Sequence, residues 1–145
     1  PDLTNSDGLH TNAIYGFLNI MFRILDEEKP DYLAVAFDLK APTFRHQMYD
    51  AYKGTRKPMP EELREQVPVL KEVLQAMGIP LLMKEGFEAD DLLGTAARVS
   101  EEKGINAVIV SGDRDLLQLA TDNVLIRMPK TKEEPQRLKI IMRLT

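Results

Sequence analysis

Residues 86–115 read GFEADDLLGTAARVSEEKGINAVIVSGDRD and form one helix-to-strand unit. A helix is predicted over residues 88–103, because acidic residues favour its first turn and Gly104 follows its end. The apolar run at residues 107–110 predicts a short buried strand. Carboxylates stand at both ends of this unit, since an acidic cluster opens the helix and Asp113 and Asp115 follow the strand.

The same alternation of helix and strand extends in both directions from this unit. Apolar residues at three- and four-residue spacings predict helices over residues 11–28 and 60–77, the second with an apolar face that includes Met77. Short apolar runs predict strands at residues 32–37, 79–83 and 124–128, and a short helix is expected over residues 113–120. Strands that alternate with helices are typical of an α/β fold with a mostly parallel sheet flanked by helices.

Composition limits the class of protein. A chain of 145 residues, 43% of them hydrophobic and 29% charged, is expected to form one globular domain. The absence of cysteine excludes disulfides and cysteine-ligated zinc, so a metal site would rely on carboxylates. No apolar run reaches the roughly 20 residues that span a bilayer. We therefore expect a cytoplasmic protein without a membrane partner.

Three groups of carboxylates follow predicted strands: Asp38, the cluster at residues 88–91, and Asp113 with Asp115. In open α/β sheets, ligands bind at the carboxyl ends of the strands. Clustered carboxylates repel one another unless a cation neutralises them, and hard oxygen ligands favour Mg²⁺ or Mn²⁺. The alternative is that each acid caps a helix or complements its dipole, at about 0.3–1 kcal/mol each.

Residues 39–60 lack a clear period and carry five basic residues against Asp50. Aromatic residues lie between these cations, as in Tyr52-Lys53-Gly54-Thr55-Arg56. Stacking rings beside phosphate-pairing cations are typical of proteins that bind single-stranded nucleic acid. The alternative is a solvated loop whose lysines keep the protein soluble.

Several strings together resemble the 5′ nuclease domain of bacterial DNA polymerase I, a family that includes stand-alone 5′-3′ exonucleases and flap endonucleases. The resemblance runs from about Thr4 to Lys132. The strings that carry it are Ala34-Val35-Ala36-Phe37-Asp38, Ala41-Pro42-Thr43-Phe44-Arg45-His46, Tyr52-Lys53-Gly54-Thr55-Arg56, Gly86-Phe87-Glu88-Ala89-Asp90-Asp91 and Ser111-Gly112-Asp113-Arg114-Asp115-Leu116-Leu117-Gln118-Leu119.

The resemblance implies a PIN-like three-layer α/β fold and hydrolysis of DNA phosphodiesters near a 5′ end or 5′ flap, in replication and repair. It also implies two divalent ions, Mg²⁺ or Mn²⁺, and a polymerase domain that follows in a longer chain. The positions that match the family's metal site and catalytic residues are Asp38, Glu88, Asp90, Asp91, Asp113 and Asp115. Those that match its helical arch, which binds the single strand, are Arg45, Tyr52, Lys53 and Arg56.

The chain departs from the family pattern at both ends. Family members begin with a strand that ends in an aspartate, and they continue into further aspartates and a helix-three-turn-helix region that binds duplex DNA. We expect both parts to be missing here, which gives a partial catalytic core at residues 1–132, a tail of unclear structure at 133–145, and reduced or absent activity.

Two other functions stay open at this point. One is a non-catalytic DNA-binding remnant that keeps the basic segment. The other is a Mg²⁺-dependent phosphatase of small molecules, because a strand-terminal aspartate followed by a later Gly-Asp pair also occurs in such enzymes. The interleaved tyrosines and cations of residues 39–60 favour DNA over a small substrate.

Overall fold

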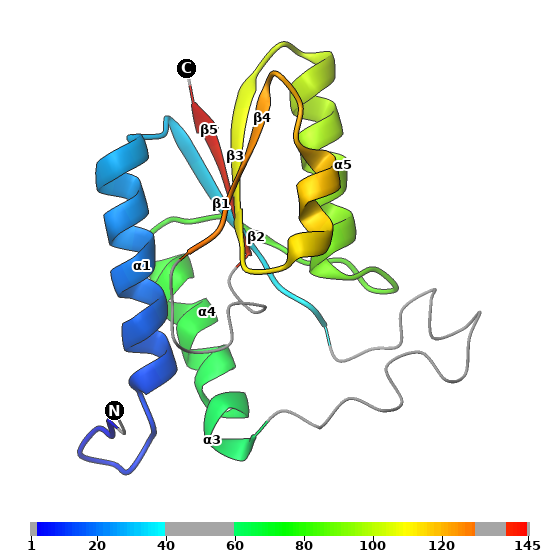
Figure 1. Ribbon diagram of the computed structural model, residues 1–145. Coiled ribbons are helices and arrows are strands. Elements are labelled where there is room, and N and C mark those ends of the chain that lie inside the picture. Colours follow the sequence, from blue (N-terminus) through cyan, green and yellow to red (C-terminus); the bar gives the residue numbers. More distant parts are fainter. Residues whose placement is uncertain (1–2, 40–59, 130–138, 145) are drawn as a thin grey trace.

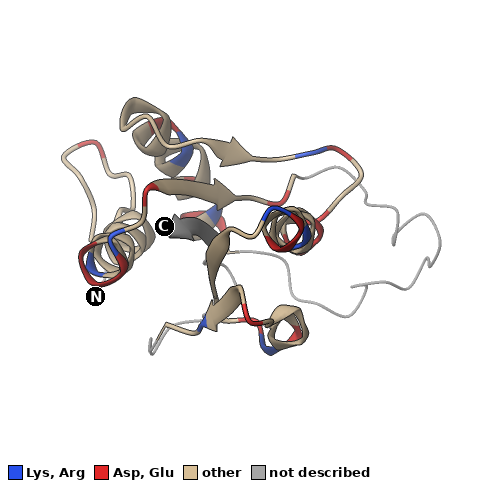
Figure 2. Ribbon diagram, turned by 90° about the horizontal axis from the view of Figure 1, so that it is seen from above, with Lys and Arg blue, Asp and Glu red and all other residues tan. Residues whose placement is uncertain are grey.

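The computed structural model describes residues 3–39, 60–129 and the strand at 139–144. Three layers are evident: α1 (Asn12–Glu28) and α4 (Gln66–Ala76) cover one face of a five-stranded sheet, and α5 (Ala89–Glu102) covers the other (Figures 1 and 2). The short α3 (Glu61–Arg64) precedes α4, and the 3₁₀ helix η1 (Arg114–Leu119) packs beside α5. The expected three-layer α/β arrangement is confirmed.

The sheet has the strand order β2-β1-β5-β3-β4. Its strands are β1 (Tyr32–Ala36), β2 (Leu81–Leu82), β3 (Asn106–Ser111), β4 (Val124–Arg127) and β5 (Lys139–Leu144). The pairs β1–β2 and β3–β4 are parallel, and β5 is antiparallel to both β1 and β3. The four strands β1 to β4 therefore run in one direction, and their carboxyl ends lie at one edge of the sheet.

Both faces of the sheet are buried, which explains why its strands appear as continuous apolar runs. Val35, Val108 and Val110 pack with helices α1 and α4 in one core cluster. Ala36 and Ile109 point to the opposite face and pack with α5, η1 and β4 in a second cluster. Side chains alternate between the two faces because successive residues of a strand point in opposite directions.

The C-terminal strand β5 occupies the centre of the sheet. Ile141 lies opposite Ala34 of β1 on one side and opposite Ile109 of β3 on the other. Within the described residues, β1 and β3 have no direct pairing, so β5 supplies the hydrogen bonds between the two parallel pairs. No structure was predicted from the sequence for the tail at residues 133–145. Its strand β5 nevertheless completes the sheet.

The helix predicted over residues 60–77 is divided at Glu65 into α3 and α4. Proline at position 68 explains the division, because its nitrogen cannot donate to the carbonyl of Arg64 and its ring would clash with that carbonyl. The predicted apolar face is correct for Leu70 and Leu74, which are buried. It is wrong for Met77, which is 44% exposed just past the end of α4.

Gln66 is the polar residue that joins α4 to the start of α1. Its Oε1 accepts hydrogen bonds from the backbone N–H of Ala13 at 2.8 Å and of Ile14 at 3.2 Å. Its Nε2 donates to Asn12 Oδ1 at 3.0 Å and to the carbonyl of Glu62 at 2.7 Å. Because the first N–H groups of a helix have no partner within it, Gln66 caps α1 from a different helix.

Gln66→Met is expected to destabilise the fold by about 2–3 kcal/mol, because one buried and one partly buried N–H group of α1 lose their acceptor while the side-chain volume is kept. Urea unfolding followed by circular dichroism measures the change. Gln75→Met, on the exposed side of the same helix, is the matched control and should alter stability by about 0.5 kcal/mol or less. Equal stability of the two variants would show that the cap is unimportant.

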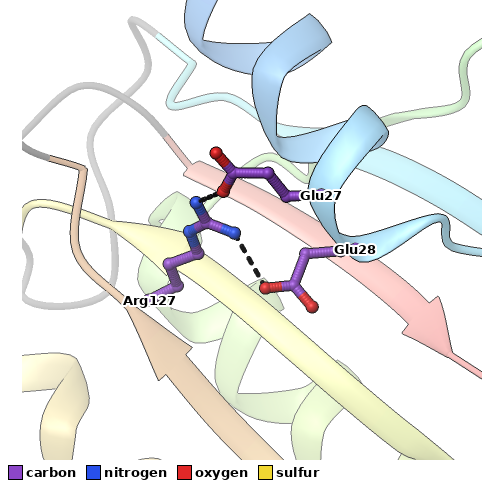
Figure 3. Close-up of polar contacts among 3 residues, drawn as sticks. All are labelled: Glu27, Glu28 and Arg127. Atoms are coloured by element: carbon purple, nitrogen blue, oxygen red, sulfur yellow. Dashed lines mark hydrogen bonds and ion pairs between the residues drawn. The ribbon is translucent and has the colours of Figure 1, made fainter.

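Arg127, the last residue of β4, joins this edge strand to the C-terminal end of α1 (Figure 3). Its Nη1 donates to Glu28 Oε1 at 2.8 Å, and its Nη2 donates to Glu27 Oε2. Two acids in the last turn of a helix are unfavourable next to the negative end of its dipole. The guanidinium offsets this repulsion and fixes α1 against the sheet.

Arg127→Met is expected to lower the free energy of unfolding at neutral pH but not in strong acid. The hydrogen bond from Arg127 holds the pKa of Glu27 below its ordinary value of 4.5. A lowered carboxylate pKa stabilises the fold above that ordinary value, and the contribution is lost as the pH falls through the lowered value. Urea unfolding of both proteins over this range tests the expectation.

Arg98→Met, on the exposed face of α5, removes the same charge and serves as the control for Arg127→Met. Its effect should not depend on pH in the acid range. A destabilisation by Arg127→Met that stays equal from neutral pH into strong acid would contradict a role for the ion pair.

No helix in residues 3–39 or 60–129 has the length and apolar character needed to cross a membrane.

Candidate metal centre

Asp38 joins the end of β1 to the start of α5. It follows β1 by two residues, and its Oδ1 accepts a hydrogen bond of 2.6 Å from the backbone N–H of Ala89. Ala89 is the first residue of α5 and lies 51 positions further along the chain. The structure thus brings Asp38 to the acidic cluster at residues 88–91, as expected for side chains at one edge of a parallel sheet.

The acidic cluster itself forms a capping box at the N-terminus of α5. The backbone N–H of Glu88 donates to Asp91 Oδ2 at 2.9 Å, and the Glu88 side chain accepts from the N–H of Asp91. Glu88 is 7% exposed, so its carboxylate is held within the protein at the helix end. Gly86, with φ of +85°, allows the turn that leads the chain from β2 into this cap.

The alternative interpretation was that the acids cap helices. Asp38, Glu88 and Asp91 do make such contacts at the start of α5. A capping role is compatible with metal binding, because an ionised carboxylate has two oxygens and about four lone-pair sites. The N–H groups of the first turn also fix the direction of each carboxylate. Each of these three acids is therefore oriented by a backbone hydrogen bond.

The second carboxylate group follows β3. Asp113 is the N-cap of η1, and its Oδ1 accepts a hydrogen bond of 2.9 Å from the N–H of Asp115. The N–H of Asp113 donates to the hydroxyl of Ser111 at 3.1 Å, and Ser111 is fully buried. Asp113 is partly buried, whereas Asp115 is exposed. Ser111 was not singled out from the sequence, although it directly precedes the Gly112-Asp113 pair.

The two carboxylate groups lie at the same edge of the sheet. They are linked through the core, because Leu116 of η1 packs in one cluster with Ala89 and Leu93 of α5. Within residues 3–39, 60–129 and 139–144, no three histidine, aspartate or glutamate side chains are close enough together to hold one metal ion. The oxygen-only donor set suits Mg²⁺ or Mn²⁺. The assignment of the six carboxylates as ligands stays a prediction.

The predicted arch residues Arg45, Tyr52, Lys53 and Arg56 lie outside the residues that the structure describes. The described chain stops at residue 39, directly after Asp38, and resumes at residue 60, before α3. Residue 39 lies three positions after the end of β1, and Pro60 is the N-cap of α3. The roles of the four residues stay predictions.

The structure also shows two cation–aromatic pairs near Asp38 that the sequence did not indicate. Lys71 Nζ lies 5.2 Å from the centre of the Phe37 ring, and Lys84 Nζ lies 5.1 Å from the centre of the Phe87 ring. The spacing of three between Lys84 and Phe87 across a glycine turn is a weak signal for the second pair. No local signal exists for the first pair, whose members are 34 positions apart.

The sequence model of a known family, described as the 5′-3′ exonuclease, N-terminal resolvase-like domain, matches residues 1–143. The chain belongs to this family. The membership confirms the resemblance on which the residues of the candidate metal centre were chosen.

Named relatives of this 5′-3′ exonuclease domain share nearly half of its residues. A DNA polymerase I of Caldicellulosiruptor bescii is 46% identical over 132 residues, which are 91% of this chain and 16% of the polymerase. A 5′-3′ exonuclease of Aquifex aeolicus is 46% identical over 133 residues, which are 92% of this chain and 46% of that protein. The domain thus spans less than half the length of either relative.

Solved structures support the fold of the exonuclease domain. The T5 5′-exonuclease with bound zinc aligns with a TM-score of 0.65 over 84% of this chain and 49% of its own, at 20% identity. The T5 D15 protein co-crystallised with metal ions aligns with the same TM-score at 23% identity, over 84% of this chain and 50% of its own. At these identities the comparison shows the three-layer fold.

Proposed function

We propose that this domain hydrolyses DNA phosphodiester bonds at a 5′ end or 5′ flap, with divalent ions held by its carboxylates. The observation that carries the proposal is the hydrogen bond between Asp38 and Ala89, because it joins the strand-end aspartate to the acidic cluster of α5. The relative named 5′-3′ exonuclease and the metal-bound T5 5′-exonuclease support the reaction and its dependence on metal.

Six carboxylates would hold the ions, which we propose to be two Mg²⁺ or Mn²⁺: Asp38, Glu88, Asp90, Asp91, Asp113 and Asp115. Bound divalent ions supply Lewis-acid activation of water and stabilise charge on the entering and leaving oxygens. The backbone N–H groups that bond to Asp38, Asp91 and Asp113 orient these carboxylates.

The basic residues between β1 and α3 would position the DNA strand. We assign this role to Arg45, Tyr52, Lys53 and Arg56, whose cations pair with phosphates and whose ring can stack on a base. The relative named DNA polymerase I supports a further part of the proposal, that a polymerase domain works beside this one in a longer chain.

Cleavage of a labelled 5′-flap DNA by the purified chain tests the proposal. With Mg²⁺ or Mn²⁺, short products released from the 5′ side are expected, and chelation by EDTA should abolish them. Circular dichroism establishes that the sample is folded. A folded sample that cleaves neither the flap nor a 5′ end with either ion would overturn the catalytic proposal, and salt-dependent binding without cleavage would favour a DNA-binding role.

A further inference from the structure

Ser111, the last residue of β3, is a polar residue that the protein buries completely. Its relative exposure is 0%, and the four residues before it in the strand are apolar and buried as well. Ile109, two positions earlier, packs in one cluster with Ala89 and Leu93 of α5. Residues two apart in a strand point to the same face, so the hydroxyl of Ser111 lies on the side of the sheet that α5 covers.

The hydroxyl of Ser111 begins a short series of hydrogen bonds that leads to two of the candidate metal ligands. Ser111 Oγ accepts from the N–H of Asp113 at 3.1 Å, and Asp113 Oδ1 accepts from the N–H of Asp115 at 2.9 Å. In each bond a side chain holds the N–H group two residues further along, which favours a turn over an extended strand. The serine thus directs the backbone from β3 into the two aspartates.

The turn that carries these aspartates is fixed at both of its ends. At its start, Ser111 is hydrogen-bonded into the sheet as part of β3. At its end, the N–H of Leu116 donates to the carbonyl of Asp113 at 3.2 Å, and Leu116 is buried against α5. Residues 112–115 lie between these two anchors, and none of them is buried. A change in the hydrogen bonding of Ser111 therefore acts first on the backbone of Asp113.

We propose that Ser111 is a positioning residue for the candidate metal centre, because its hydroxyl holds the turn that carries the Asp113 carboxylate. A partly buried N–H group that loses its acceptor is costly, so without the hydroxyl the turn shifts to give this N–H another partner. The carboxylate of Asp113 moves with its backbone. The inference rests on the proposed function, which assigns Asp113 as a ligand, and it adds a residue that is not itself a ligand.

A purely structural role of the same hydrogen bond predicts a different result. If the hydroxyl of Ser111 satisfied the N–H of Asp113 and did nothing more, its removal would lower the free energy of unfolding and leave the affinity for metal unchanged. A positioning role predicts that metal affinity falls in a protein that is still folded. Metal binding measured without DNA therefore separates the two roles.

The test is the binding of Mn²⁺ to the full chain, measured from the electron paramagnetic resonance signal of the free ion. Ser111→Ala is expected to weaken Mn²⁺ binding about 10-fold, because removal of a group that orients a metal ligand typically costs about 10- to 100-fold in affinity. The lower end applies because the hydroxyl contacts the backbone of Asp113 and not its carboxylate. Exchange of the amide hydrogen of Asp113 should also accelerate, and circular dichroism checks the fold.

Two further variants control this experiment. Ser111→Thr keeps the hydroxyl and is expected to bind Mn²⁺ within about 3-fold of the unsubstituted chain. Ser100→Ala removes a serine hydroxyl near the C-terminal end of α5, where Ser100 Oγ donates to the carbonyl of Ala96 at 2.8 Å. This control loses the same chemical group far from the acidic cluster along the helix, and should change Mn²⁺ binding less than about 2-fold.

The inference is overturned if folded Ser111→Ala binds Mn²⁺ within about 2-fold of the unsubstituted chain, or if folded Ser111→Thr binds it as weakly as Ser111→Ala. An unsubstituted chain that does not bind Mn²⁺ would also overturn it. Because Mn²⁺ binding and DNA cleavage are separate measurements, a chain that cleaves flap DNA while Ser111→Ala binds Mn²⁺ normally would remove the inference alone. A chain whose Mn²⁺ binding responds to Ser111→Ala as expected, but which cleaves no DNA, would remove the hydrolytic function alone.

Discussion

Asp113→Asn is expected to lower the rate of 5′-flap cleavage by about 100-fold or more, since loss of one group that stabilises transition-state charge costs about 2.7–4 kcal/mol. The substitution separates two roles of this residue. Asparagine keeps an oxygen that can accept the hydrogen bond from the N–H of Asp115, which is 2.9 Å long in the unsubstituted protein. The N-cap of η1 is therefore kept while the negative charge is lost.

Asp90→Asn, in the first turn of α5, should have an effect of similar size on the same assay. Single-turnover cleavage at saturating Mg²⁺, with unfolding midpoints measured in parallel, gives the rates and the stability. Asp122→Asn is the matched control, because this exposed aspartate precedes β4 at the opposite edge of the sheet. Full activity in a folded Asp113→Asn protein would show that this carboxylate is a helix cap and not a metal ligand.

Ile141→Pro is expected to destabilise the fold by about 3 kcal/mol or more, a large part of the 5–15 kcal/mol that is typical of a domain. Position 141 lies in the middle of β5, opposite Ala34 of β1 and Ile109 of β3. Proline has no N–H, and it is found in sheets at edges and bulges and not in central strands. The hydrogen bond that is lost belongs to β5, the strand that joins the two parallel pairs.

Urea unfolding and amide hydrogen exchange measure the effect of Ile141→Pro. Exchange should accelerate in β1 and β3 together, because β5 hydrogen-bonds to both strands. Ile141→Val keeps the N–H and is the control. If Ile141→Pro were as stable as Ile141→Val, residues 139–144 would not hold the sheet together.

Much of the fold was predictable because its signals are local. The three- and four-residue spacings over residues 11–28 predicted α1, and the acidic first turn with the later Gly104 predicted α5 within a residue at each end. The break between α3 and α4 also has a local cause in Pro68. The expected strand at residues 79–83 was too long, since β2 contains Leu81 and Leu82.

The candidate site was predictable in part for a related reason. Carboxylates after successive strands of an α/β chain meet at one edge, and Asp38 does meet the start of α5. The tail gave no such signal: Lys139–Leu144 has no turn or helix pattern that would place it between β1 and β3. The strands that β5 pairs with, β1 and β3, are distant from it in the sequence, so the pairing is defined by the three-dimensional structure.

The sequence by itself determined the alternation of helices and strands, the positions of the six acids and the membership of the 5′-3′ exonuclease family. The tertiary structure decided that Gln66 caps α1, that β5 completes the sheet, and that Lys71 and Lys84 lie over aromatic rings. The physical reason is the range of each interaction. Periodicity, caps and turns act within a few residues, whereas the bond between Asp38 and Ala89 spans 51 positions and forms once the sheet has brought its strand ends together.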